Sequence, residues 1–261
     1  MSGADMKIIL SMSGKGGVGK SLMAVGIATA LAKRGLKVGI LDLDVRSPNL
    51  TYVLGTDNTV KVNADGRPEP KYVSIDGVTL PVFSSGMIFG DRTGIIMDGR
   101  EMQSLIEGMV YQVVWPDLDY MVVDMDPSSG DSLQAITRLM RHVYAFVVTT
   151  SDVSSLQDCR RMMDACRYLG IKVNGIVGNM VGVECPSCGH ALKCSDCGCS
   201  VSFGDERPVV DMALEYNVPY LGSLPWNPKY KTDPVASVQG MGAGLFNTLA
   251  NVVISAKEVV V

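Results

Sequence analysis

A glycine-rich loop near the N-terminus, Ser13–Ser21, is the strongest constraint on the fold. It satisfies the pattern G-x-x-x-x-G-K-S and joins an apolar run, Lys7–Met12, to a helical pattern, Lys20–Arg34. A strand, such a loop and a helix form a phosphate site, because backbone N–H groups and the helix dipole point at the anion. We expect Lys20 to reach the outer phosphates and Ser21 to ligate Mg²⁺. The expected backbone cradle is Gly14, Lys15, Gly16, Gly17, Val18 and Gly19.

Apolar strand-like segments alternate with helical segments along most of the chain. The further expected strands are Lys37–Leu43, Tyr120–Met125, Val143–Thr149, Ile171–Asn179 and Pro219–Leu224. The further expected helices are Glu101–Val114, Asp131–Arg141, Asp152–Leu169, Arg207–Tyr216 and Val238–Lys257. Buried strands separated by helices imply crossover connections and a parallel sheet. The sequence therefore predicts one α/β domain over residues 1–261, with a single doubly wound, mostly parallel sheet.

Two stretches interrupt this alternation. Residues 57–85 contain two turn signals, near Asp65 and Asp76, and are expected to form an excursion with a hairpin. Residues 182–204 have almost no apolar periodicity and are expected to form a cysteine-rich insertion between a strand and a helix.

Composition excludes several classes of protein. The net charge of −4 gives no electrostatic case for nucleic-acid binding. No apolar run is long enough for stable insertion into a membrane, and the N-terminus shows no signal-peptide pattern. These features predict a soluble, cytoplasmic protein.

Carboxylates end two of the expected strands. Asp42 and Asp44 close the second strand, and Asp124 lies at the end of the strand that begins at Tyr120. Ligands of open α/β sheets bind at the carboxyl ends of the strands, which places these side chains beside the phosphate loop. Mg²⁺ prefers a few carboxylates together with phosphate oxygens.

The cysteines are unevenly distributed. Five of the seven fall between Cys185 and Cys199, and the pattern C-x-x-C-G occurs twice, at Cys185 and Cys194. This spacing suits both zinc and iron–sulfur ligation. Four thiolates, Cys185, Cys188, Cys194 and Cys197, would suffice for one closed Zn²⁺ site, in which Cys199 has no place. The two remaining cysteines are expected in the core, on one helix.

The phosphate loop resembles that of the MinD/ParA/nitrogenase-reductase class, because Lys15 adds the second lysine of the deviant Walker A motif. This resemblance implies a homodimer in which Lys15 reaches the partner's nucleotide. It also implies that Asp44 orients the attacking water, that Asp42 and Asp124 serve the Mg²⁺ site, and that Asn179 contacts adenine. Residues 126–131 would be a second switch that senses the γ-phosphate.

The chain is also similar to the Mrp/ApbC/Nbp-type iron–sulfur cluster carriers. The resemblance rests on the phosphate loop, Asp42–Asn49, Val123–Asp131, and Asn179-Met180 followed by Cys185-Pro186-Ser187-Cys188. It implies ATP-dependent holding of a [4Fe–4S] cluster by Cys185 and Cys188 of two chains, and its transfer to apoproteins. The chain departs from the family pattern by substitutions in both switches, Arg46, Ser47, Asp126 and Ser128, and by the three further cysteines.

Hydrolysis of ATP by such a site is expected to be slow and to depend on Lys15, Lys20 and Mg²⁺. Two other functions stay open at the level of sequence. One is a MinD/ParA-like positioning ATPase with a structural zinc knuckle. The other is an ATP-gated electron donor resembling nitrogenase reductase.

Overall fold

The computed structural model describes residues 6–90, 96–127, 130–140, 142–233, 238 and 242–256. The described residues form an eight-stranded sheet with the order β10-β9-β8-β1-β7-β2-β6-β5. Its strands are β1 (Lys7–Met12), β2 (Val38–Asp42), β5 (Lys71–Ile75), β6 (Val78–Ser84), β7 (Tyr120–Asp124), β8 (Val143–Thr149), β9 (Lys172–Val183) and β10 (Tyr220–Trp226).

Neighbouring strands of this sheet run parallel, with one exception at its edge. β5 pairs antiparallel with β6, whereas β6 pairs parallel with β2. Successive side chains of each strand enter opposite faces of the sheet. In β1, Ile8 and Leu10 join one buried core and Ile9 joins the other. Both faces are therefore covered, as expected for strands that read as continuous apolar runs.

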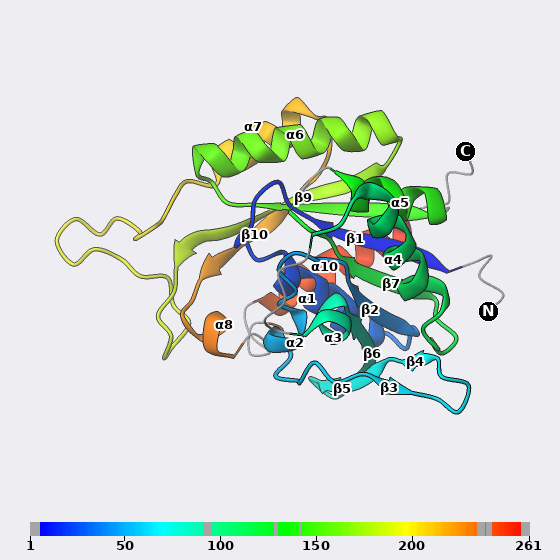
Figure 1. The fold of residues 1–261 in the computed structure, drawn as a ribbon. Helices are drawn as coiled ribbons and strands as arrows, with labels where there is room; N and C mark the ends of the chain where they lie inside the picture. The colour runs from blue at the N-terminus through cyan, green and yellow to red at the C-terminus, as the bar shows by residue number, and fades with distance from the viewer. Residues whose placement is uncertain are drawn as a thin grey trace.

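The helices form a layer on each face (Figure 1). The helices α1 (Lys20–Ala32) and α10 (Gly242–Ser255) cover one face and pack against each other. The other face is covered by α4 (Gly99–Tyr111), α5 (Asp131–Leu139), α6 (Val153–Leu169) and α7 (Arg207–Glu215). The short helices include α2 (Leu50–Val53), α3 (Ser85–Phe89) and α8 (Lys229–Thr232).

The predicted doubly wound, mostly parallel fold is confirmed, and most expected elements lie within a few residues of their predicted bounds. Two differ. The excursion at 57–85 holds two hairpins, a small one of β3 (Lys61–Val62) and β4 (Pro68–Glu69), and a second whose strands β5 and β6 extend the main sheet. β6 joins the sheet because Leu80–Ser84 is buried throughout. β9 runs four residues beyond the predicted end at Asn179.

Some predictions fall partly outside the described residues. These are the start and end of the helix expected at Val238–Lys257, and Arg141 at the end of another.

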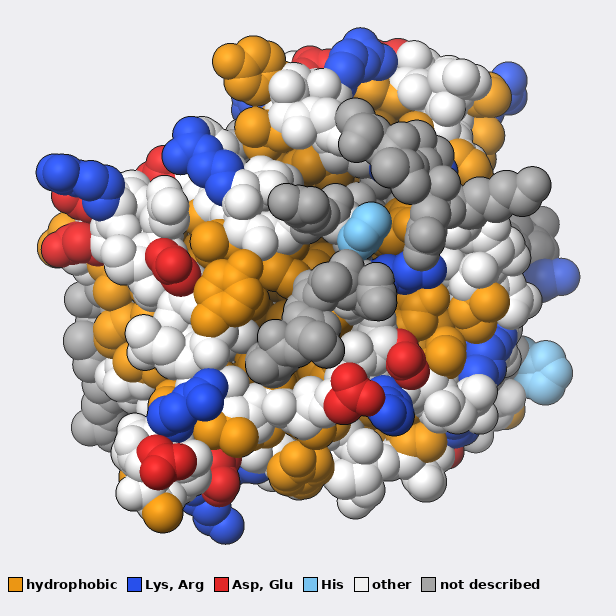
Figure 2. Space-filling model, turned by 90° about the vertical axis from the view of Figure 1, so that its right-hand side faces the viewer, with side chains coloured by type: hydrophobic (Ala, Val, Ile, Leu, Met, Phe, Trp, Pro, Cys, Tyr) orange, Lys and Arg blue, Asp and Glu red, His pale blue; other side chains and the backbone are white. Residues whose placement is uncertain are grey.

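In the described part of the chain, no helix is both long enough and apolar enough to cross a membrane. Acidic and basic side chains are interspersed on the face that carries α4 and α5 (Figure 2).

Candidate functional site

Two glycines of the phosphate loop are required by its close packing. Gly19, just before α1, has φ of +96°, and a Cβ there would lie 2.1 Å from the Asn179 side-chain nitrogen. That nitrogen donates to the Val18 carbonyl at 2.7 Å. Gly14 approaches the backbone of Asp158 on α6 so closely that a Cβ would lie 2.2 Å from it. The loop is therefore held between β9 and α6 by contacts that only glycine allows.

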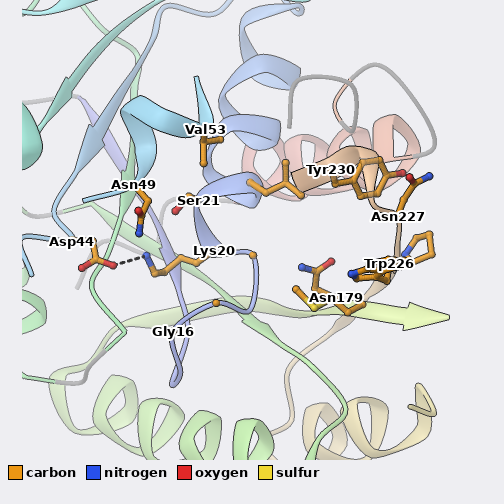
Figure 3. Close-up of a pocket in the computed structure, with 15 residues that line it drawn as sticks. Gly16, Lys20, Ser21, Asp44, Asn49, Val53, Asn179, Trp226, Asn227 and Tyr230 are labelled. Atoms are coloured by element: carbon orange, nitrogen blue, oxygen red, sulfur yellow. Dashed lines mark ion pairs between the residues drawn. The ribbon is translucent and has the colours of Figure 1, made fainter. Parts of the chain in front are cut away.

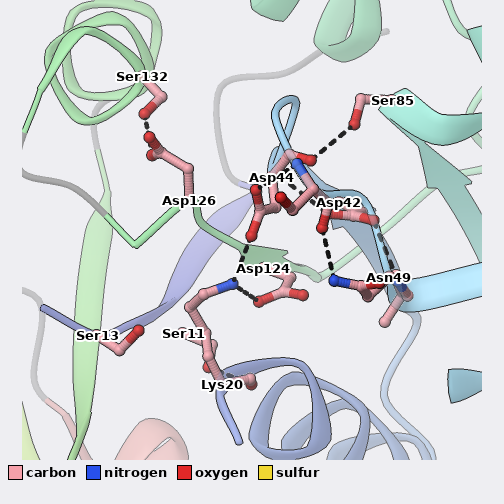
Figure 4. A network of polar contacts seen from close by, with 12 residues as sticks. Ser11, Ser13, Lys20, Asp42, Asp44, Asn49, Ser85, Asp124, Asp126 and Ser132 are labelled. Atoms are coloured by element: carbon pink, nitrogen blue, oxygen red, sulfur yellow. Dashed lines mark hydrogen bonds and ion pairs between the residues drawn. The ribbon is translucent and has the colours of Figure 1, made fainter. Parts of the chain in front are cut away.

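The phosphate-loop lysine is buried among carboxylates (Figure 4). Its Nζ lies 2.7 Å from Asp124 Oδ1 and 3.6 Å from Asp44 Oδ2. Burial alone would lower the pKa of Lys20, but the hydrogen bond and attraction of Asp124 raise it above its usual value. Lys20 is thus a fixed cation at the mouth of the loop.

Asp42, the last residue of β2, and Asp44, two residues beyond it, have different surroundings. Asp42 is fully buried and accepts from Ser84 Oγ at 2.8 Å, Asp44 N at 3.0 Å and Leu50 N at 3.4 Å. Asp44 extends beyond it and faces the pocket, where it pairs with Lys20 (Figure 3). Asp42 therefore holds the loop after β2 in place rather than lining the pocket.

Burial is the main reason why the pKa values of Asp42 and Asp44 are raised. It raises the pKa of Asp42 to about 7, and Asp124, its direct neighbour in the β2–β7 register, adds repulsion. It raises the pKa of Asp44 to about 6, against the opposing attraction of Lys20. Perturbed carboxylates in a cleft are typical of functional sites.

The two oxygens of Asp124 differ in their partners. Oδ1 accepts from Lys20 Nζ, whereas Oδ2 is buried and has no hydrogen-bond partner among the described residues. Ser21 lines the pocket that opens at Lys20. A buried carboxylate oxygen without a hydrogen-bond donor, on the side chain that bonds the phosphate-loop lysine, fits a Mg²⁺ ion that also binds phosphate oxygens or water.

The pocket beside the phosphate loop has a volume of about 290 Å³ (Figure 3). Gly17, Gly19, Lys20 and Ser21 line one side, together with Asp44 and Asn49. The far side comes from β10 and the segment after it, through Trp226, Asn227 and Tyr230. Sequence reasoning missed these three residues, since no motif marks them and only their place after a predicted strand pointed to this edge of the sheet.

The structure places the other predicted site residues differently with respect to the pocket. Asn179 is buried and lines the pocket, and its contact with adenine stays a prediction. Lys15 lies outside the pocket, where its Nζ is 2.6 Å from Ser154 Oγ and 3.4 Å from Asp152 Oδ1. In the segment expected to be the second switch, Asp126 is buried and accepts from Ser132 Oγ, and Ser128 lies outside the described residues.

The cysteine insertion contains two turns of the same construction. In the first, Cys185 N donates to the His190 carbonyl at 2.9 Å and Gly189 N donates to the Cys185 carbonyl at 2.8 Å. In the second, Cys194 N donates to the Cys199 carbonyl at 2.8 Å and Gly198 N donates to the Cys194 carbonyl at 3.0 Å. We call these turns the first and second knuckle.

Backbone N–H groups point at the leading sulfur of each knuckle. Those of Cys188 and Ser187 lower the pKa of Cys185, and those of Cys197 and Asp196 lower the pKa of Cys194. Donors of this kind favour a thiolate, which is the form that binds metals. Each knuckle therefore supplies two cysteines, in a turn suited to metal ligation.

The two pairs of cysteines are not brought together. Among the described residues, no three His, Cys, Asp or Glu side chains lie close enough to hold one metal ion. The insertion extends away from the sheet beyond β9 (Figure 1, yellow). The arrangement thus does not assemble the Zn²⁺ site of Cys185, Cys188, Cys194 and Cys197 that the sequence left open. Cys159 and Cys166 are buried on α6, as predicted.

Two curated relatives are similar in sequence to this chain over most of its length. It is 32% identical over 228 residues to the Saccharomyces cerevisiae protein named "Cytosolic Fe-S cluster assembly factor CFD1", covering 85% of this chain and 75% of the relative. It is 34% identical over 226 residues to a "Cytosolic Fe-S cluster assembly factor Nubp2 homolog" of Drosophila ananassae, covering 85% of this chain and 83% of the relative.

Solved structures share the fold. A nucleotide-binding protein from Archaeoglobus fulgidus, in complex with ADP, aligns with a TM-score of 0.68 and 25% identity over 89% of this chain and 86% of that chain. The septum site-determining protein MinD of Pyrococcus horikoshii aligns with a TM-score of 0.64 and 21% identity over 97% of this chain and 100% of that chain. A protein-family model described as "ParA: NUBPL iron-transfer P-loop NTPase" matches residues 5–241. The glycine loop, its lysine and carboxylates, and this match over most of the chain establish that it belongs to the NUBPL iron-transfer P-loop NTPase family.

Proposed function

We propose that this chain is an ATP-hydrolysing carrier that assembles or holds a [4Fe–4S] cluster and transfers it to apoproteins in the cytoplasm. The observation that carries the proposal is that one strand serves both sites. β9 contributes Asn179 to the nucleotide pocket, and Cys185 follows two residues after its end at Val183. A displacement of this strand at the nucleotide would move the cysteine pair.

The nucleotide half of the proposal assigns a role to each pocket residue. Lys20 binds the outer phosphates, and the loop from Gly14 to Gly19 holds them through backbone N–H groups. Ser21 and Asp124 would hold Mg²⁺, which supplies charge neutralisation on the phosphates. Asp42 would serve the Mg²⁺ site indirectly, because it accepts from the backbone nitrogen of Asp44 and so holds the loop that carries Asp44.

Hydrolysis needs an oriented water and stabilisation of the charge on the γ-phosphate. Asp44 lines the pocket, and its raised pKa suits a group that accepts a hydrogen bond from the attacking water. Lys15 would leave Asp152 and Ser154 and enter the site of a second copy, which makes turnover depend on the homodimer. Lys15 is partly exposed and can make this exchange without unfolding any element.

The cluster half of the proposal uses the first knuckle. Each chain offers two thiolates, Cys185 and Cys188, whereas a [4Fe–4S] cluster is held by four. Two chains of a homodimer supply them together. The curated relatives are named as cytosolic iron–sulfur assembly factors, which supports both the cargo and the compartment.

Anaerobic reconstitution with iron and sulfide tests the proposal. The wild type is expected to gain broad visible absorption and about four irons per dimer. The Cys185→Ser/Cys188→Ser variant is expected to gain neither. Cys166→Ala is the matched control, because it removes a buried thiol on α6 and leaves the knuckles intact. Equal iron in the wild type and the double variant would contradict the proposal.

A further inference from the structure

The second knuckle repeats the first after nine residues. Glu184 bridges Ala191 in the first, and Lys193 bridges Ser200 in the second. The hydrogen bonds that close the two turns are also nine residues apart. Leu192 N donates to the Val183 carbonyl, and Val201 N donates to the Leu192 carbonyl. The second turn thus reproduces the hydrogen bonding of a cysteine pair that the proposed function already uses.

No buried side chain explains the shape of the second knuckle. Cys197, Cys199 and the residues from Ala191 to Lys193 are exposed, and Cys194 is only partly covered. The nearby apolar side chains Leu192, Val201 and Phe203 are 38%, 43% and 68% exposed. An exposed turn gains little from the hydrophobic effect, and small folds of this kind are usually held by a metal.

The ligand count of the second knuckle is two. Cys199 corresponds to His190 of the first knuckle, because the backbone carbonyl of each accepts from the leading cysteine of its turn. No third ligand joins Cys194 and Cys197 among the described residues. A closed tetrahedral site needs two more thiolates, and Cys185 and Cys188 are engaged by their own cargo in the proposed function.

We propose that Cys194 and Cys197 form a second metal-binding pair, which binds one soft divalent ion such as Zn²⁺ together with the same two cysteines of a second copy of the chain. This inference rests on the homodimer of the proposed function. The dimer would then carry two four-thiolate sites, one for the cluster and one that fixes the two insertions against each other.

Titration with Co²⁺ alone tests the inference, on reduced, metal-free and nucleotide-free protein without sulfide. Tetrahedral thiolate sites are expected to bind about two Co²⁺ per wild-type dimer and about one in Cys185→Ser/Cys188→Ser. The Cys194→Ser/Cys197→Ser variant is expected to bind about one, and the fourfold variant none. Cys199→Ser is the matched control and is expected to bind as the wild type does. All four positions are at least partly exposed, so these substitutions leave the buried core of the domain unchanged.

The oligomeric state supplies the second readout. Co²⁺ is expected to make Cys185→Ser/Cys188→Ser dimeric in sedimentation, and the fourfold variant is expected to stay monomeric. A Cys185→Ser/Cys188→Ser protein that binds no Co²⁺, or that binds it as a monomer, overturns the inference. Loss of all Co²⁺ from both double variants overturns it too, because that result indicates one site shared by both knuckles within a chain.

Iron reconstitution separates this inference from the proposed function. If Cys194→Ser/Cys197→Ser still takes up about four irons per dimer while Co²⁺ shows no second site, only the inference fails. If the wild type takes up no iron, the proposed function fails, whatever the Co²⁺ titration gives.

Discussion

The backbone nitrogen of Glu184 donates to the carbonyl of Trp226 at 3.1 Å. Glu184 directly precedes Cys185, and Trp226 lines the nucleotide pocket. The buried Glu184 carboxylate also accepts from the side chains of Asn227 and Tyr230, which line the same pocket. The first knuckle is therefore tied directly to the wall of the nucleotide site.

Glu184→Ala is expected to weaken nucleotide binding about tenfold. The change removes the acceptor that fixes the side chains of Asn227 and Tyr230 at the pocket wall, so nucleotide binding has to order them, and the loss of such a contact corresponds to about 1–3 kcal/mol. Glu184→Gln is the matched control, because its amide oxygen still accepts. Calorimetric titration with ADP measures the effect. Equal affinities for the wild type and Glu184→Ala would refute the link.

Lys20→Met is expected to abolish nucleotide binding and to destabilise the nucleotide-free protein by about 3 kcal/mol. The reason is that Asp124 would stay buried without its cation. Lys33→Met is the control, since Lys33 pairs with Asp76 at the surface and exposed pairs contribute about 0–1 kcal/mol. Urea unfolding measures both. A Lys20→Met protein as stable as the wild type would show that the ion pair does not organise the site.

Gly19→Ala is expected to lose nucleotide binding, because the added Cβ displaces Asn179 from the Val18 carbonyl. Gly35→Ala is the control, since Gly35 also has positive φ, +82°, but a Cβ there meets nothing within 4 Å. Both variants are expected to lose about 1–2 kcal/mol of stability from backbone strain. Binding of ADP by Gly19→Ala with wild-type affinity would show that the Asn179 contact is dispensable.

The nucleotide-free protein is expected to lose stability as pH rises from about 5 to about 8. Burial raises the pKa of Asp42 to about 7 from 3.8, so the folded state holds this proton more tightly than the unfolded chain. Its contribution is fully present below pH 3.8 and is lost as pH rises through about 7.

Asp42→Asn is expected to reduce this pH dependence by an amount on the order of 2 kcal/mol, because an asparagine keeps the acceptor for Ser84 and does not ionise. Urea unfolding at the two pH values, with Mg²⁺ and nucleotide absent, gives the slopes. The same slope in the wild type and in Asp42→Asn would contradict the assignment.

Local signals predicted the phosphate loop and the parallel core well, because continuous apolar runs and a strand–loop–helix motif leave few alternatives. The hairpin of β5 and β6 was expected from the turn at Asp76 and Gly77, but the place of β6 in the main sheet was missed, because its pairing with β2 is a long-range contact that no local pattern records. Its burial could only be seen once β2 was in place beside it.

Only part of the nucleotide site could be predicted from the sequence, for a similar reason. Lys20, Ser21 and Asp124 belong to motifs with fixed spacing, whereas Trp226 and Tyr230 reach the pocket only through the path of the chain after β10. The contacts of Lys15 with Ser154 and of Asp42 with Ser84 depend on tertiary packing. The repeat of the two knuckles was visible as C-x-x-C-G, but its shared backbone hydrogen bonds required the structure.

Release of the cluster under nucleotide control tests the central claim most directly. The reconstituted wild type is mixed with an apo-ferredoxin, with and without MgATP, and loss of cluster absorption from the carrier is followed. MgATP is expected to change the transfer rate in the wild type and to leave it unchanged in Lys20→Met. The same rate with and without MgATP in the wild type would contradict the claim that the nucleotide pocket and the first knuckle act together.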